Sequence, residues 1–257
     1  MEIELDQPHP VDQPDGLDDL RRVLAPRLDP HATRWLAAAT ASVAADPDTL
    51  TSLFPQAGRW CGRKPLTPGG AGQWAARGEP DTSAPDTSAP DTSAPDTSVP
   101  RTDLDGWQVQ DAARTVLLAA LPTATAPRVA VVTRIYQHGD AAEKRGVLRA
   151  LPLLNLGDAA LAITRDALRT NDSRLVAAAL GPYAARHLDD QAWRHGVLKC
   201  VFLEVDLTVV ADLERRADAE LGRMLGDLAA ERAAAGRRLP ADAQVLLGRL
   251  ANARPLW

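Results

Sequence analysis

Two stretches of the chain resemble each other closely enough to restrict the fold classes that the chain can adopt. Residues 142–150 read AEKRGVLRA, and residues 192–200, which lie 50 positions further on, read AWRHGVLKC. An aspartate of the kind that caps helices, Asp140 or Asp190, stands two residues before each stretch. Repetition of a capped helical unit is typical of an α-solenoid, so we predict an all-α, HEAT-like bundle of stacked helix pairs. Chance similarity in a chain rich in alanine and arginine is the alternative.

The rest of the chain also has helical periodicity. Leu17, Leu20 and Leu24 recur on one helical face near the start, and no stretch shows the alternation of a half-buried strand. Residues that cap or break helices separate these runs and predict the boundaries between successive helices. These boundaries fall at Asp46-Pro47, Pro122, Pro127, Gly139-Asp140, Gly157-Asp158, Asn171-Asp172, Gly181-Pro182 and Asp189-Asp190. At Asp140 the glutamate three residues later, Glu143, predicts a capping box.

Two further helices are predicted near the C-terminus. A long helix is expected from about Asp206 to Gly236, because leucines and alanines recur along one face of it. Asp212 and Arg216 stand four residues apart on this helix and are expected to pair on its surface. A last helix is expected to begin at Pro240.

A repeated pentapeptide interrupts the helical pattern. Residues 80–99 read PDTSA three times and then PDTSV, and a proline at every fifth position blocks both helices and sheet ladders. We therefore predict a disordered linker over residues 68–103, with a docking role for the tract as the alternative. The predicted organisation is a flexible N-terminus (1–16), a helical segment (17–67) packing on the main domain, the linker, and a helical-repeat domain (104–254). The two flanks of the linker are expected to share a single aliphatic interior.

Composition and charge restrict the functional classes. The formal net charge of -5 disfavours a nucleic-acid binder, which carries a basic stripe. Cys61 and Cys200 stand far apart and outside metal-ligand spacing, so no disulfide framework, metal or cofactor is expected. The acidic N-terminus lacks a signal peptide, and no apolar run is long enough to span a bilayer. We expect a cytoplasmic protein that does not insert into the membrane.

A first candidate ligand site lies in residues 54–66, which read FPQAGRWCGRKPL. Arg59, Arg63 and Lys64 supply donors suited to phosphate or carboxylate, and the two glycines allow a ligand to approach the backbone. The spacing of a phosphate-binding Walker loop is absent. A solvated basic loop after a short helix is the structural alternative.

A second candidate site surrounds His187. A histidine two residues before the paired carboxylates Asp189 and Asp190 is suited to acid–base chemistry or to metal binding, but no third partner stands at metal-ligand spacing. Asn171, in a separate polar loop, is a further candidate ligand-binding residue. The structural alternative is that Asp189 or Asp190 caps a helix, while Trp193 fills the core between helices. Cys200 occupies the apolar position that corresponds to Ala150, which favours a small core residue over a nucleophile.

Three strings of the sequence carry a family resemblance. FPQAGRWCGRKPL, LRTNDSRLVAAALGPYAARHLDDQAWRHGVLKCVF and RRADAELGRML resemble the EboA-domain family of bacterial proteins. The resemblance covers residues 17–66 and 104–250, with the PDTSA tract as an insertion. It implies an all-helical protein encoded beside a prenyltransferase and other enzymes that synthesise or export a secondary-metabolite precursor. It implies no reaction and no catalytic residue.

Three hypotheses of function follow. The preferred one is a non-catalytic scaffold or adaptor whose partners are other proteins of the same biosynthetic cluster, because helical repeats offer extended binding surfaces. The alternative is a small-molecule-binding protein or enzyme that holds a phosphorylated or carboxylated metabolite between the basic loop and His187 and Asp190. The third is a solenoid that binds unrelated protein partners.

Overall fold

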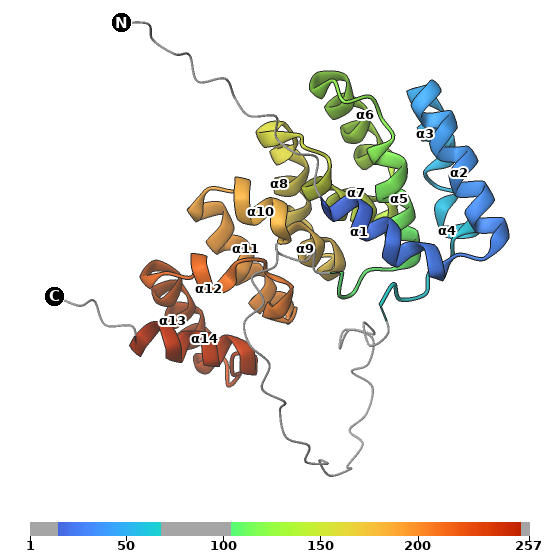
Figure 1. Ribbon diagram of the computed structural model, residues 1–257. Helices are drawn as coiled ribbons and strands as arrows, with labels where there is room; N and C mark the ends of the chain where they lie inside the picture. The colour runs from blue at the N-terminus through green and yellow to red at the C-terminus, as the bar shows by residue number, and fades with distance from the viewer. Residues whose placement is uncertain (1–14, 68–103, 253–257) are drawn as a thin grey trace, which may run out of the picture.

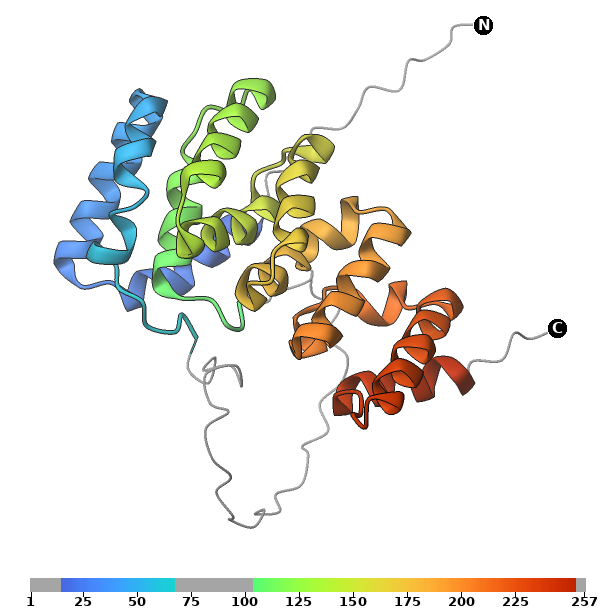
Figure 2. The same ribbon diagram turned by 180° about the vertical axis from the view of Figure 1, so that it is seen from behind.

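The computed structural model describes residues 15–67 and 104–252, and all regular secondary structure within these ranges is helical (Figure 1). The predicted all-α class is therefore confirmed for the described residues, while the HEAT-like arrangement stays a prediction. The predicted linker over 68–103 lies outside the described residues, as does most of the predicted flexible segment 1–16. In Figures 1 and 2 the helices follow one another broadly in chain order, from α2 at one end to α14 at the other.

Four helices precede residue 68. They are α1 (Asp15–Leu24), α2 (Pro30–Ala45), α3 (Leu50–Leu53) and α4 (Ala57–Trp60), with single 3₁₀ turns η1 (Ala25–Arg27) and η2 (Pro47–Thr49). Asp29 caps α2 by accepting a 2.8 Å hydrogen bond from the Ala32 N–H, and Pro30 occupies the first turn, where its missing N–H costs nothing. The helices α1, α2 and α4 all pack against α5, so this segment lies on the remainder of the molecule.

The chain segments on either side of residues 68–103 are tied to each other. The Leu66 N–H donates to the Trp107 carbonyl oxygen at 2.8 Å, and the Val109 N–H donates to the Lys64 carbonyl oxygen at 2.9 Å. Pro65 and Gln108 form an isolated antiparallel bridge between these bonds. The chain therefore leaves the helical body and re-enters it at one place.

Most of the central helices begin at or next to the predicted boundaries, although one begins at Thr125, two residues before Pro127, and another begins at Leu161, after a 3₁₀ turn at the Gly157-Asp158 boundary. The central helices are α5 (Val109–Ala119), α6 (Thr125–His138), α7 (Ala141–Ala150), α8 (Leu161–Arg169), α9 (Ser173–Ala179), α10 (Pro182–His187) and α11 (Asp190–Leu203), with 3₁₀ turns η4 (Leu151–Leu153) and η5 (Gly157–Ala160). The predicted capping box of α7 is present, because the Asp140 carboxylate accepts the Glu143 N–H at 2.8 Å and the Glu143 carboxylate accepts the Asp140 N–H at 3.0 Å. Asp172 and Asp189 are single N-caps of α9 and α11, and their carboxylates accept the N–H groups of Arg174 and Ala192.

The two similar stretches make the same kind of contact. Gly146 of α7 lies so close to Arg114 that an added Cβ would stand 2.8 Å from the Arg114 Cδ atom. At the matching position of α11, a Cβ on Gly196 would stand 2.7 Å from a methyl carbon of Leu180. The residues that follow, Val147 and Val197, are both fully buried. The similarity therefore marks the points where each helix is approached closely by a neighbour.

The predicted long helix from Asp206 to Gly236 is wrong. The structure has a 3₁₀ turn η6 (Leu207–Val209) and separate helices α12 (Leu213–Arg216) and α13 (Ala219–Ala234), followed by α14 (Ala241–Asn252). Asp206 and Asp218 each accept a backbone hydrogen bond as N-caps, and Asp212 has a left-handed backbone with φ of 58°. Three aspartates therefore restart the helix where its apolar periodicity runs on. The last helix begins next to Pro240, as predicted.

The predicted pair between Asp212 and Arg216 is also absent. Asp212 instead pairs with Arg215 at 2.6 Å, and Arg216 reaches Asp190 at 2.7 Å. The reason is that α12 ends at Arg216 and turns this side chain toward α10 and α11. There the guanidinium also donates to the Leu188 carbonyl oxygen at 2.9 Å.

Arg216 belongs to a group of three arginines that satisfy carbonyl oxygens at helix ends. Arg128 donates to the carbonyl of Ala119, the last residue of α5, and to the carbonyl of Leu121 just beyond it. Arg232 donates to the carbonyls of Val201 and Phe202 in the last turn of α11. The last four carbonyls of a helix have no partner within it, and a cation there is also favoured by the helix dipole. These arginines join helices that lie apart in the sequence.

The apolar interior of the described residues consists of two clusters, and the two flanks of residues 68–103 share the first of them, as expected. The first draws on both flanks of residues 68–103, from Leu17 to Leu66 and from Trp107 to Tyr183, and the second runs from Val176 to Leu246. Helix α9 supplies neighbouring residues to different clusters, Leu175 to the first and Val176 to the second. Because α9 is buried on two sides, it divides the interior.

Candidate functional site

The structure separates the two sets of ligand-binding residues that the sequence predicts. Arg59 lies on α4 and Arg63 and Lys64 lie in the turn after it, all three exposed. Helix α4 packs on α2 and α5, whereas α10, which carries His187, packs on α8. Both views show α4 and α10 well apart (Figures 1 and 2). The two sets are therefore not brought together into one site.

The two glycines of the basic loop have structural roles. A Cβ on Gly58 would stand 2.6 Å from the Gln110 side-chain oxygen, so glycine lets α4 approach α5 closely. Gly62 has a φ of 84°, a left-handed conformation that disfavours other residues. At Gly58 it is therefore the Gln110 side chain of α5, and not a ligand, that lies close to the backbone.

Each predicted residue of the second site has a partner within the protein. The His187 Nδ1 atom lies 2.7 Å from an Asp158 carboxylate oxygen, and its ring lies against Tyr183. Asp190 accepts from Arg216 at 2.7 Å. The Asn171 side-chain oxygen accepts from the Lys199 ammonium at 2.8 Å. These bonds link α10, α11 and the loop before α9 to their neighbours.

Both cysteine thiols are buried, and burial raises the pKa of Cys61 and of Cys200 to about 12. At pH 8 a thiol with this pKa is ionised to a fraction on the order of 10⁻⁴. We expect the native protein to resist alkylation by iodoacetamide at pH 8, and both thiols to react once guanidinium unfolds the chain. Mass spectrometry of the two samples measures this. Rapid labelling of the native protein at either cysteine would contradict it.

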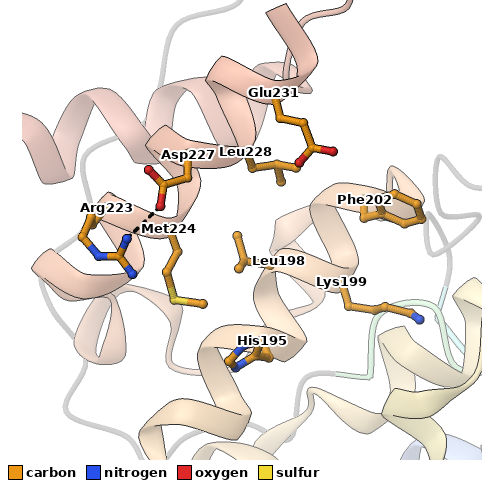
Figure 3. Close-up of a pocket in the computed structure, with 9 residues that line it drawn as sticks. All are labelled: His195, Leu198, Lys199, Phe202, Arg223, Met224, Asp227, Leu228 and Glu231. Atoms are coloured by element: carbon orange, nitrogen blue, oxygen red, sulfur yellow. Dashed lines mark hydrogen bonds and ion pairs between the residues drawn. The ribbon is translucent and has the colours of Figure 1, made fainter. Parts of the chain in front are cut away.

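A groove runs between α11 and α13 (Figure 3). One part of it has a volume of about 450 Å³ and continues into a second hollow of about 370 Å³ that shares His195, Arg223 and Met224 with it. The residues that line the first part are His195, Leu198, Lys199, Phe202, Arg223, Met224, Asp227, Leu228 and Glu231. We call this feature the α11–α13 groove.

Apolar side chains form the floor of the α11–α13 groove. Leu198 and Met224 point into the space between the two helices in Figure 3, with Leu228 beside them. Phe202, at the end of α11, leaves 62% of its surface exposed, which is unusual for a large apolar residue. The groove therefore offers apolar surface that no part of residues 15–67 and 104–252 covers.

The two edges of the groove carry different charges. Lys199 stands on the α11 side, and Glu220, Asp227 and Glu231 stand on the α13 side. Arg223 donates to both Glu220 and Asp227 at 2.7 Å, and its hydrogen bond holds the pKa of Glu220 below its usual range. The α13 edge is therefore acidic on balance, while the α11 edge is basic.

The sequence contains a signal for this groove that the predictions above did not use. On α11 the lining residues Gln191, His195, Leu198 and Phe202 follow helical spacing, and the same holds on α13. A stripe that mixes apolar and charged residues reads as an ordinary helix surface. Only the packing of α11 beside α13 makes two such stripes into the walls of a groove.

The described residues contain neither a membrane-spanning helix nor a metal-binding group. No helix within residues 15–67 and 104–252 has the length and apolar character needed to cross a membrane. The same residues contain no group of three or more His, Cys, Asp or Glu side chains placed to hold a metal ion.

The helical fold and the open groove together define a helical protein with a partly apolar surface groove. The chain belongs to the EboA family, because the family model described as "Metabolite traffic protein EboA" matches residues 86–247. The family resemblance expected from the sequence is thereby confirmed. The match begins inside the PDTSA tract, so α1 to α4 precede it. Neither the curated proteins nor the solved structures contain a significant match.

Proposed function

We propose that this protein is a non-catalytic adaptor in a bacterial secondary-metabolite pathway, and that its α11–α13 groove binds an amphipathic helix of a partner protein. The observation that supports the groove as a docking site is its apolar floor beside the exposed ring of Phe202. The family description, a metabolite traffic protein, agrees with a role in a pathway.

The shape of the groove favours a protein partner. Small-molecule sites bury roughly 70–90% of their ligand, whereas this groove is open along its length. An amphipathic helix needs to bury only one face, with anchors spaced at three and four residues. The opposite charges of the two edges would also orient the partner helix in the groove. The partner helix is expected to place acidic residues beside Lys199 and basic residues beside Asp227 and Glu231.

A substitution at Phe202 tests the docking role. Phe202→Glu places a charge on the apolar surface, and it is expected to weaken partner binding at least about tenfold, because buried aromatic anchors dominate such interfaces. Stability should change by no more than about 0.5 kcal/mol, because the side chain is exposed. The measurement is co-purification of the tagged chain with the proteins encoded beside it, followed by titration calorimetry of any pair recovered.

A matched control is available on α14. Val245 is 72% exposed and lies outside the residues that line the groove, so Val245→Glu should leave partner binding unchanged. Recovery of the wild-type protein alone under mild conditions would contradict an adaptor role. Equal loss of the partner in both variants would contradict the groove as the docking site.

A small-molecule-binding function is the second candidate. The observation that favours it is the volume of the groove, about 450 Å³, which falls in the range of ligand pockets, roughly 300–1,000 Å³. In this case a metabolite of the pathway would bind with its apolar part against Leu198 and Met224. Binding of a small molecule that Phe202→Glu abolishes, without any protein partner, would support this function over the adaptor.

A further inference from the structure

A second exposed aromatic surface lies at the other end of the molecule. Trp60 of α4 leaves 43% of its surface exposed and stacks on Trp35 of α2, with ring centroids 6.1 Å apart and planes inclined by 13°. Figures 1 and 2 both place α2 and α4 at the end opposite α13 and α14. The two rings are nearly parallel, and Trp60 stays partly exposed beside Trp35.

Basic side chains without ion pairs stand beside this pair in the sequence. Arg59, Arg63 and Lys64 are exposed, and none of them forms an ion pair with a described residue. Many other surface arginines of the described chain are paired, for example Arg21 with Asp18 and Arg165 with Asp189. The segment thus carries three positive charges that no residue within 15–67 and 104–252 neutralises.

The basic segment is held on a fixed base. Ala57, the first residue of α4, is fully buried, and the Lys64 carbonyl oxygen accepts the Val109 N–H at 2.9 Å. Gly58 lies directly against the Gln110 side chain. Because the backbone is fixed on both sides of Trp60, binding here loses less conformational entropy than binding to a free loop.

We propose that Trp35, Trp60, Arg59, Arg63 and Lys64 form a second interaction surface, which we call the tryptophan patch. Its partner is an acidic segment of another protein that places one apolar or aromatic side chain on the open face of Trp60. Tryptophan and arginine are the residues most enriched among those that dominate protein interfaces. This inference goes beyond the proposed function, because two surfaces at opposite ends let one molecule hold two partners at once.

The geometry of the tryptophan pair favours a protein segment over other anions. The mutual stacking of Trp35 and Trp60 leaves too few open ring faces for a series of stacked bases. A membrane surface would favour several protruding apolar side chains, whereas Trp60 is the one large apolar residue of α4 that is exposed.

A synthetic peptide tests the tryptophan patch in the full chain. The probe is a peptide of about twelve residues, made of glutamate and aspartate around one central phenylalanine, so that tryptophan fluorescence reports on the protein alone. We expect saturable binding that weakens when the salt concentration rises from about 50 to about 300 mM, because exposed charges are screened. Arg59→Glu combined with Arg63→Glu should weaken binding at least about tenfold.

Two controls separate this surface from the rest of the protein. Arg237→Glu combined with Arg238→Glu reverses two exposed charges elsewhere and should leave peptide binding unchanged. Phe202→Glu should also leave it unchanged, so the patch and the α11–α13 groove can fail independently. Circular dichroism checks that each variant is folded.

Three results would overturn the proposal. They are no saturable binding of the peptide, an equal loss in the Arg237 and Arg238 variant, and tighter binding of phosphatidylglycerol vesicles or a single-stranded oligonucleotide than of the peptide.

Discussion

Replacing Asp111 by alanine is expected to lower the free energy of unfolding by about 3–5 kcal/mol, the usual cost of removing one partner from a buried ion pair. Asp111 is fully buried on α5. Its carboxylate accepts from Arg149 at 2.6 Å and from Arg145 at 3.1 Å, both on α7. Without Asp111, two guanidinium groups lose their carboxylate partner inside the molecule.

Asp111 also caps the helix that carries it. The carboxylate oxygen that accepts from Arg149 also accepts the Gln108 N–H at 2.9 Å, at the point where the chain returns from residues 68–103. The guanidinium of Arg149 lies 5.5 Å from the centre of the Trp107 ring, and burial lowers the pKa of Arg149 while the charge of Asp111 raises it. One carboxylate thus joins the start of α5 to the surface of α7.

Urea unfolding followed by circular dichroism measures the effect of Asp111→Ala. Asp18→Ala is the matched control, because Asp18 pairs with Arg21 on the surface and its loss should cost about 0.5 kcal/mol or less. The double variant of Asp111→Ala with Arg149→Ala should cost about 1–3 kcal/mol less than the sum of the two single variants. A loss below about 1 kcal/mol for Asp111→Ala would show that the ion pairs do not hold α5 and α7 together.

Replacing Trp193 by alanine is expected to cost about 3–5 kcal/mol through the cavity left behind. Trp193 of α11 is fully buried in the second apolar cluster. The Arg216 guanidinium lies 4.8 Å from the centre of its ring, so the same substitution also removes a contact that positions this helix-end arginine. We expect the midpoint of thermal unfolding to fall by several degrees.

Trp193→Phe separates the volume of the side chain from its polar atom. The Trp193 ring N–H is buried without a hydrogen-bond partner, so phenylalanine removes an unsatisfied donor while it leaves a smaller cavity. The cost of Trp193→Phe should therefore stay below about 1.5 kcal/mol. If Trp193→Ala unfolds at nearly the normal temperature, Trp193 does not support the second cluster.

Much of the fold is predictable because helix signals are local. A capping aspartate bonds to a backbone N–H three residues away, as Asp140 does to Glu143, and this bond forms wherever the helix lies in the molecule. The boundaries at Asp172, Gly181-Pro182 and Asp189 are local for the same reason. The family can also be recognised from the sequence, because the family model matches residues 86–247.

The errors arose where local signals compete. Apolar residues continue at helical spacing from Asp206 to Gly236, yet Asp212 and Asp218 end that helix and start others. The spacing of apolar residues indicates which side chains face the interior. This spacing can continue across a short break between two helices, so it does not reveal the break. An aspartate on a helix can pair with an arginine three or four residues further on, so spacing alone does not distinguish Arg215 from Arg216 as the partner of Asp212.

The candidate site could be predicted only in part. Arg59, Arg63 and Lys64 stand out because three basic residues fall within residues 59–64, and the tryptophan patch that we propose includes them. Their connection to His187 was a hypothesis about distance, and sequence carries little information about distances between remote segments. The α11–α13 groove has no motif at all, because it arises from the ordinary surfaces of two helices.

By itself the sequence determined that this chain is helical, where most of its helices begin, and to which family it belongs, because these properties depend on neighbouring residues. The tertiary structure alone decided which groups meet. Asp111 finds Arg145 and Arg149 more than thirty positions away, and Arg216 finds Asp190 across 26 positions. Such pairs form only when packing brings two helix faces together, and the same packing creates the α11–α13 groove.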